Sequence, residues 1–249
     1  MCIRDRSEPD LSFILTLRPS ITILQLLLTV SSSVLLPLAT PNVTLRRDMD
    51  KSLLTARTRL EDKISIVRTR VLDIALAWVS KLLARQARTD FRPRDDDALH
   101  GLDALSTPTC AAVFEFLTRV HRLCVSALDG PKNQTRFFTD LASGVRSLLF
   151  EHFRKFQINL AGGLMVSKDI TRYLELLKSW PLAPGFVQGL EVLVEIGTLF
   201  VIGPEALKER LRGGGGSALA GVDKADLRPY LLRREDVGTV GVQAVLSAL

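Results

Sequence analysis

The sequence predicts an all-α protein built as one or more antiparallel helical bundles, and three observations support this. Apolar residues recur at spacings of three and four over most of the chain, which is the period of one helix face. Short segments containing Pro or Gly separate these stretches, as in bundles of antiparallel neighbours. Aromatic residues make up only 6% of the 249 residues while Leu and Ala are abundant, which favours helices over a sheet.

Composition narrows the class of protein without selecting a partner. Hydrophobic residues at 47% and charged residues at 24% exclude a disordered chain. The net charge of +6 is compatible with acidic proteins, anionic membrane or nucleic acid, but favours none of them. Cys110 and Cys124 fall on one expected helix, roughly 21 Å apart at the helical rise, so they cannot form a disulfide with each other. These cysteines indicate a reduced, cytosolic compartment.

Residues 1–20 do not resemble the rest of the chain. Their first segment, MCIRDRS, is similar to a peptide that arises when adapter sequence is translated, so we expect residues 1–20 to be non-native or disordered. The folded region is therefore expected to comprise residues 21–249.

Ile21–Leu38 contains no charged residue and has two interpretations. Its 18 residues come close to the length needed for a transmembrane helix, which would make the protein membrane-anchored. Gln25, three consecutive serines, Pro37 and the acidic residues that precede the segment argue against a span or a signal anchor. We expect a buried central helix, since a helix that is apolar on all sides can lie inside a bundle.

A long helix is expected from Asp48 to about Arg88, because an apolar stripe close to the heptad period runs through it without Pro or Gly. The segment Thr89–Pro93 ends it, and Arg94–Asp97 is expected to be a solvated loop. The stripe comprises Leu53, Leu60, Ile64, Val67, Val71, Ala75, Trp78 and Leu82.

Start and stop signals divide the remainder into helices. Thr107-Pro108 predicts a start, and Gly162-Gly163 predicts an end that is followed by a new helix capped by Ser167. Gly213–Gly216 is expected to be a loop. The expected helices cover about 107–128, 134–161, 167–180, 185–202, a short stretch after Pro204, 224–234 and 238–248.

No motif predicts a catalytic, cofactor or metal site. His100, His121 and His152 are far apart, and neither CxxC nor HExxH occurs, so structural or surface roles are favoured for them. Gly213–Gly216 lacks the Lys-Ser/Thr of a phosphate loop, and Asp95–Asp97 lacks the Gly and Glu of a calcium loop. We predict neither an enzyme nor a protein that binds a small-molecule substrate. Nucleic-acid recognition is not predicted either, because no such signature occurs.

Four arginines of the long helix form two rows outside its apolar stripe, because residues eleven apart are nearly in register. They could contact an anionic lipid or an acidic partner helix. They could equally be an ordinary solvated face, which is the interpretation we favour because acidic residues lie on the same helix. The rows are Arg57 with Arg68 and Arg59 with Arg70.

Several long segments resemble the C-terminal region of the Sec-ten subunit of the exocyst, the complex that tethers secretory vesicles to the plasma membrane. The resemblance covers about residues 21–249, and its segments are LDIALAWVSKLLARQARTDFRPRDDD (72–97), STPTCAAVFEFL (106–117), FEHFRKFQINLAGGLMVSKDITRYLELLKSW (150–180), GPEALKERLR (203–212) and GSALAGVDKADLRPYLLRRED (216–236).

The resemblance implies the C-terminal helical-bundle region of a longer, rod-shaped tethering subunit. It implies contact with other exocyst subunits, most closely the Sec-fifteen subunit, and only indirect contact with vesicle and plasma membrane. It also implies a cytoplasmic protein that is recruited to sites of exocytosis and docks vesicles before fusion, without chemical activity. The residues expected to matter are structural: Trp78, Phe153, Phe156, Gly162, Gly163 and Trp180.

Overall fold

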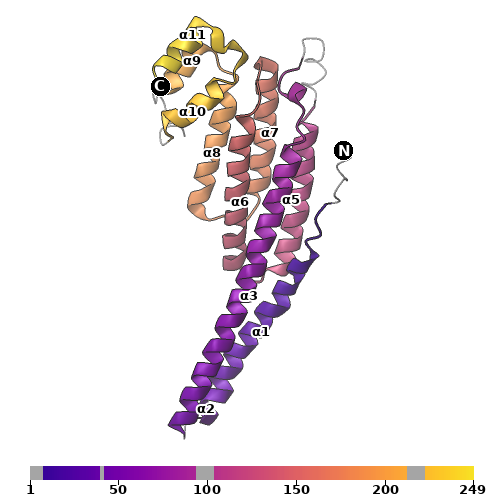
Figure 1. Cartoon of the computed structure of the whole chain (residues 1–249), viewed down its shortest axis with the longest axis vertical. Coiled ribbons are helices and arrows are strands. Elements are labelled where there is room, and N and C mark those ends of the chain that lie inside the picture. The colour runs from indigo at the N-terminus through magenta and orange to yellow at the C-terminus, as the bar shows by residue number, and fades with distance from the viewer. Residues whose placement is uncertain (1–7, 40–41, 94–103, 212–221) are drawn as a thin grey trace, which may run out of the picture. The chain divides into compact units, whose positions relative to one another are not determined.

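The computed structural model describes residues 8–39, 42–93, 104–211 and 222–249, and it confirms the all-α prediction (Figure 1). No β-strand occurs among these residues, although Ile158 and Arg234 form an isolated bridge. Three segments with sequence-based expectations, Arg94–Asp97, His100 and Gly213–Gly216, lie outside the described residues. The main helices are α1 (Leu17–Val30), α2 (Leu36–Ala39), α3 (Val43–Leu83), α5 (Pro108–Ala127), α6 (Pro131–Phe153), α7 (Leu160–Lys178), α8 (Pro184–Leu199), α9 (Pro204–Leu211), α10 (Lys224–Leu231) and α11 (Val240–Ser247).

The chain divides into two compact units. Unit 1 comprises residues 1–78 and 119–137, and unit 2 comprises residues 79–118 and 138–249. Helices α3, α5 and α6 therefore contribute residues to both units.

Unit 1 contains a helical hairpin whose two legs are α1–α2 and the first part of α3 (Figure 1). A 3-10 turn, Ser12–Thr16, precedes α1, and a π-helical turn, Ser31–Leu35, joins α1 to α2. Pro37 lacks a backbone N–H and would disrupt a regular α-helix. The wider π-helical turn directly before it accommodates the proline, and helical structure continues through this position. The first leg buries Leu17, Ile21 and Ala39, and the turn before it buries Ile14.

The prediction that Ile21–Leu38 is a buried helix is wrong within this structure. The helical stretch Ser12–Ala39 is long and apolar enough to span a membrane by length and composition, yet only 11% of its most apolar window is buried. Length and composition of one such helix near an N-terminus are weak grounds for a membrane span.

In unit 2, α7 and α8 pack against each other, and parts of α5 and α6 belong to the same unit. Its interior contains Phe116, Leu141, Leu149, Ile170 and Leu193, all at most 1% exposed. A second apolar cluster joins the end of α8 to the C-terminal helices, and its members are Leu199, Leu207, Leu211, Leu227, Leu231, Val242, Val245 and Leu246.

The start of α5 agrees with its sequence signal, whereas the boundary between α6 and α7 does not. The Thr107-Pro108 start is confirmed, and the Thr107 hydroxyl oxygen accepts a hydrogen bond from the Cys110 N–H at 3.1 Å. The helix expected over 134–161 instead ends at Phe153. The next helix begins at Leu160, because the Asn159 side chain caps it by accepting a hydrogen bond from the Gly162 N–H at 2.8 Å. Ser167, expected to be the cap, lies inside α7.

The expectation that Gly162-Gly163 ends a helix is also wrong, since both glycines lie in the first turn of α7 and are buried. A Cβ on Gly162 would stand 1.7 Å from the carbonyl oxygen of Phe91, and one on Gly163 would stand 2.9 Å from that of Phe200. The pair is therefore required for close approach of backbones rather than for a turn.

Candidate functional site

Described residues offer no cluster of three or more His, Cys, Asp or Glu that could hold a metal ion. His152 is 4% exposed and packs against the rings of Phe91, Phe153 and Phe156, with centroids 6.3, 5.4 and 4.9 Å away. Burial, with a contribution from Lys155, lowers the pKa of His152 to about 4. Such a histidine is neutral at pH 7 and serves as part of an aromatic core.

Asp169 is a buried carboxylate whose partners explain its position. It accepts hydrogen bonds from the Thr107 N–H at 2.8 Å and from the Thr107 hydroxyl at 2.7 Å, which fixes the start of α5 against α7. Burial raises its pKa to about 6, and the two bonds from Thr107 act in the opposite direction. The Cys110 thiol also lies against Asp169 and donates to its backbone carbonyl oxygen at 3.8 Å, while burial raises the pKa of this thiol well above its ordinary value. A buried thiol that stays protonated is a poor nucleophile, so the arrangement serves to cap a helix.

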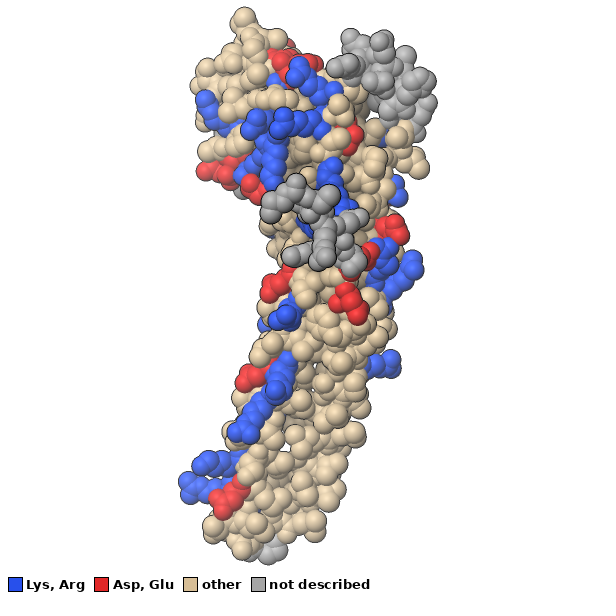
Figure 2. Space-filling model, turned by 45° about the vertical axis from the view of Figure 1, so that its right-hand side comes forward, with Lys and Arg blue, Asp and Glu red and all other residues tan. Residues whose placement is uncertain are grey.

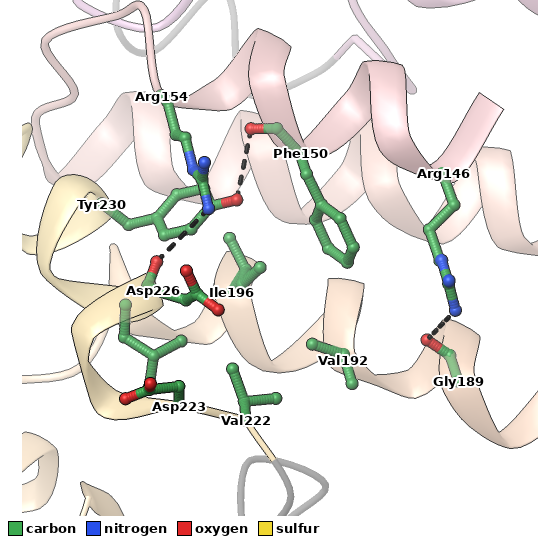
Figure 3. A pocket seen from close by; sticks show the side chains of 11 residues that line it. Arg146, Phe150, Arg154, Gly189, Val192, Ile196, Val222, Asp223, Asp226 and Tyr230 are labelled. Atoms are coloured by element: carbon green, nitrogen blue, oxygen red, sulfur yellow. Dashed lines mark hydrogen bonds between the residues drawn. The ribbon is translucent and has the colours of Figure 1, made fainter. Parts of the chain in front are cut away.

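A pocket of about 340 Å³ lies in unit 2 where α6, α8 and α10 meet, and Figure 3 shows it from close by. The pocket combines an apolar surface with Arg146 of α6, Arg154 just after α6, and two aspartates near the start of α10. Asp223 is engaged as the cap of α10, since it accepts a hydrogen bond from the Ala225 N–H at 3.0 Å. The lining residues are Arg146, Phe150, Arg154, Gly189, Val192, Ile196, Val222, Asp223, Asp226, Leu227 and Tyr230.

The arginines of this pocket are held by the protein itself. Arg154 lies 5.1 Å from the ring centroid of Tyr230 and forms an ion pair with Glu151 at 3.0 Å (Figure 3 shows its contact with Tyr230). Arg146 lies 5.1 Å from the ring centroid of Phe186, and its guanidinium donates to the carbonyl of Gly189 at 3.4 Å. The Nε atoms of both arginines are buried. Both arginines and Asp223 of this pocket therefore have partners within the protein.

The most unusual surface of the described chain is the first leg of the hairpin in unit 1. Ile23, Leu26, Val30 and Val34 are 58%, 58%, 44% and 46% exposed, although they are large apolar residues at helical spacing. Figure 2 shows this leg as a broad face without charged residues at the bottom of the view, with charged side chains along one edge. An exposed apolar stripe of this kind is typical of an interaction surface.

The four arginines singled out in the sequence lie on α3, in the second leg of the same hairpin. Arg57 is exposed and pairs with Glu61 at 2.8 Å along the helix. Arg59 and Arg70 are exposed and Arg68 is half-buried. Acidic residues on the same helix are compatible with an ordinary solvated face. That these arginines bind an anionic partner stays a prediction.

The residues expected to be structural fall into different environments. Phe153 is 1% exposed and Phe156 is half-buried, and both pack on Phe91, with centroids 5.9 and 5.2 Å apart. Trp180 is 4% exposed and packs on Phe138 at 5.4 Å, whereas Trp78 on α3 is only half-buried.

Phe91 and Asn159 were missed by sequence reasoning. The Phe91 carbonyl oxygen accepts a hydrogen bond from the Asn159 N–H at 3.3 Å, and the Asn159 side chain donates to the carbonyl of Pro93 at 3.0 Å. An Asn three residues before a helical glycine was the available signal, because Asn is a preferred cap.

Comparison with known proteins gives a match along nearly the whole chain. A family model described as "Exocyst complex component Sec10-like, alpha-helical bundle" matches residues 1–246. This match includes residues 1–20, and whether those residues are native stays a prediction.

Curated relatives give the same family. Exocyst complex component 5 of Oryza sativa subsp. japonica is 30% identical over 179 residues, covering 72% of this chain and 21% of the relative. Exocyst complex component SEC10a of Arabidopsis thaliana is also 30% identical over 179 residues, covering 72% of this chain and 20% of the relative. Exocyst complex component SEC10 of Saccharomyces cerevisiae is 26% identical over 227 residues, covering 91% of this chain and 25% of the relative. The chain thus spans about a fifth to a quarter of the length of these relatives.

Proposed function

Because the chain belongs to the Sec-ten family of exocyst components, we propose that it works as part of a subunit that tethers secretory vesicles at the plasma membrane. The observation on which this rests is the family match over residues 1–246. Its relatives are named exocyst complex components, and the chain matches them over a part of their length. On this proposal the protein is cytoplasmic and is recruited to sites of exocytosis.

The proposed mode of action is protein–protein contact rather than catalysis. His152 is enclosed by phenylalanine rings, and Asp169 is occupied by a helix cap. The pocket in unit 2 holds its arginines through internal partners. His152 and Asp169 are thus engaged in stabilising the fold, while unit 1 exposes a large apolar stripe. These features support a scaffold whose helices bind other exocyst subunits, with the Sec-fifteen subunit as the first candidate.

Affinity capture from extract of the cells that produce the protein tests this proposal. A tagged chain should co-purify with other exocyst subunits, identified individually by mass spectrometry, and the Sec-fifteen subunit should be among them. A tagged, unrelated helical bundle of similar charge provides the control. Recovery of the chain without any exocyst subunit would contradict the proposal.

A membrane-anchored protein is the second candidate. The observation in its favour is that the apolar Ser12–Ala39 stretch is largely exposed. Alkaline carbonate extraction separates the two. A subunit held by protein contacts is released into the supernatant, whereas a chain anchored by a transmembrane helix stays in the pellet.

A further inference from the structure

The first leg of the unit 1 hairpin carries two apolar stripes on different sides. One side includes Leu17 and Ile21, which are 1% and 8% exposed. The other includes Ile23, Leu26, Val30 and Val34, which are 44–58% exposed. The second set is spaced by three, four and four residues, the spacing with which one helix packs on another.

Polar side chains next to the exposed stripe already have partners within the helix. The hydroxyls of Thr22 and Thr29 donate to carbonyl oxygens four residues earlier at 3.0 and 2.9 Å, and the hydroxyl of Ser33 does the same. Covering this face with another apolar surface would therefore leave none of these three hydroxyls without a hydrogen bond.

The two legs of the hairpin differ in charge. The first leg has no charged side chain between Arg18 and Arg46. The part of helix α3 that belongs to unit 1 and forms the second leg has eight Lys or Arg and five Asp or Glu, so this leg is net positive. Figure 2 shows positive and negative side chains along one edge of the hairpin, in the lower part of the view. A partner with acidic residues beside its apolar contact is complementary to this surface.

We propose that Ile23, Leu26, Val30 and Val34 form the docking stripe for an amphipathic α-helix of another exocyst subunit. That helix has apolar residues at spacings of three and four and acidic residues along one border. The inference rests on the proposed function, because it names the surface through which the exocyst contact is made.

Two other occupants fit the same observations less well. A bilayer would have to accept Arg46, Arg47, Asp48, Asp50 and Lys51, which stand in the first turns of α3 next to the tip of the hairpin. A second copy of this chain would bring a second net-positive leg to the contact.

Capture with charged variants tests the stripe. The double variant Leu26→Asp/Val30→Asp places two carboxylates in the stripe. The control Gln25→Asp/Thr29→Asp places two carboxylates one residue earlier on the same helix, at exposed positions outside the stripe. Circular dichroism and thermal melting establish that each variant is folded. Ile23→Ser/Val34→Ser, a milder change at the two ends of the stripe, is used in parallel in case the first variant does not fold.

The wild-type chain and the control should capture exocyst subunits to within about twofold of each other, while the stripe variants lose at least about tenfold. Equal capture by wild type and stripe variants would overturn the inference and leave the proposed function standing. Failure of the wild type to capture any exocyst subunit would overturn the proposed function and the inference with it.

Two further measurements address the other occupants. Flotation with phosphatidylcholine–phosphatidylserine vesicles should leave the wild-type chain unbound, and binding that the stripe variants lose would overturn the inference in favour of a membrane. Analytical ultracentrifugation should show no dimer that depends on the stripe. A wild-type dimer that becomes a monomer in the stripe variants would overturn the inference in favour of self-association.

Discussion

At the scale of single residues, the packing of unit 2 depends on places where backbone approaches backbone. Gly162 has no room for a side chain, because its Cβ would lie 1.7 Å from the Phe91 carbonyl oxygen and 2.3 Å from the carbonyl carbon. Neither atom belongs to a flexible side chain that could move aside. The chain from residue 91 to 93 and the start of α7 therefore have to separate if this position gains a methyl group.

Gly162→Ala should destabilise the protein by about 3 kcal/mol or more, at the upper end of the cost of overpacking. Gly185→Ala is the matched control, because nothing lies within 4 Å of its Cβ position and alanine favours a helix. Urea denaturation of both variants measures the difference. Equal free energies of unfolding for the two variants would show that the close approach at Phe91 is not real.

His152 predicts a pH dependence of stability. Its pKa is lowered from 6.5 to about 4 by burial, so between these values the unfolded chain binds a proton that the folded chain does not. The stability contributed by this group is complete above pH 6.5 and is lost as the pH falls toward 4, by on the order of 3 kcal/mol.

In His152→Gln the part of the acid sensitivity that comes from His152 should disappear. Asp169, whose pKa is raised to about 6, contributes with the opposite sign, and it is common to both proteins. The wild-type minus variant difference in free energy of unfolding, measured from pH 7 to pH 4.5, isolates the histidine. A difference that does not change with pH would contradict the buried, neutral state of His152.

At the scale of elements, α5 and α7 are joined by a cap that one helix provides for the other. The Thr107 hydroxyl both accepts from the Cys110 N–H and donates to Asp169, so the two residues form one unit. Thr107→Ala should cost about 1–2 kcal/mol as the loss of a cap. Asp169→Ala should cost about 1–3 kcal/mol, since the Thr107 N–H is left without its acceptor.

The double variant Thr107→Ala/Asp169→Ala should be less destabilised than the sum of the single variants by roughly 1 kcal/mol or more, because the same interaction is removed twice. Chemical denaturation of the four proteins in the cycle measures this coupling. Strict additivity would mean that the cap and the carboxylate act independently.

The C-terminal helices α9, α10 and α11 depend on their shared apolar cluster. Leu231 is 0% exposed within this cluster, whereas Leu232, the next residue, is 45% exposed. Leu231→Ala should destabilise this part of unit 2 by roughly 2–5 kcal/mol, while Leu232→Ala should cost much less. Hydrogen exchange of α10 and α11 reports the effect locally. Similar exchange in both variants would argue against the cluster as the source of their stability.

Helix positions could be predicted from the sequence wherever a local signal determined them. Thr107-Pro108 and Pro204 each start a helix where expected. The end of α6 could not be predicted, because apolar residues continue past Phe153 at helical spacing. Contacts with other parts of the chain determine this end instead, because the Ile158 N–H donates to the backbone carbonyl oxygen of Arg233 and Asn159 caps the start of α7.

Two other sequence-based predictions, for Gly162-Gly163 and for Ile21–Leu38, are wrong for the same reason. The sequence shows the type of each residue but not which residues it contacts in the folded protein. Gly162 and Gly163 have the freedom to end a helix, yet they are needed for the approach of Phe91 and Phe200. Likewise, an apolar segment such as Ile21–Leu38 predicts burial without stating what covers it. One side of this segment packs within unit 1 and the other remains exposed.

At the scale of the whole molecule, apolar surface is distributed in two ways. In unit 2 a buried apolar core joins helices to one another and encloses His152 and Asp169, and the exposed apolar residues include Leu160 and Val240. In unit 1 part of the apolar surface faces outward on the hairpin. The proposed function gives this division a physical meaning, since a protein that acts as a tethering subunit would need a stable bundle and a surface for other subunits.

The central claim is that the exposed hairpin face meets a helix of another exocyst subunit. Site-specific crosslinking in living cells, from a photoreactive amino acid at position 30, tests this most directly. The account predicts crosslinked peptides from an apolar face of a helix in another exocyst subunit, and few such peptides from a probe at position 25. Crosslinks to lipid, to a second copy of the chain, or to no exocyst peptide at all would contradict it.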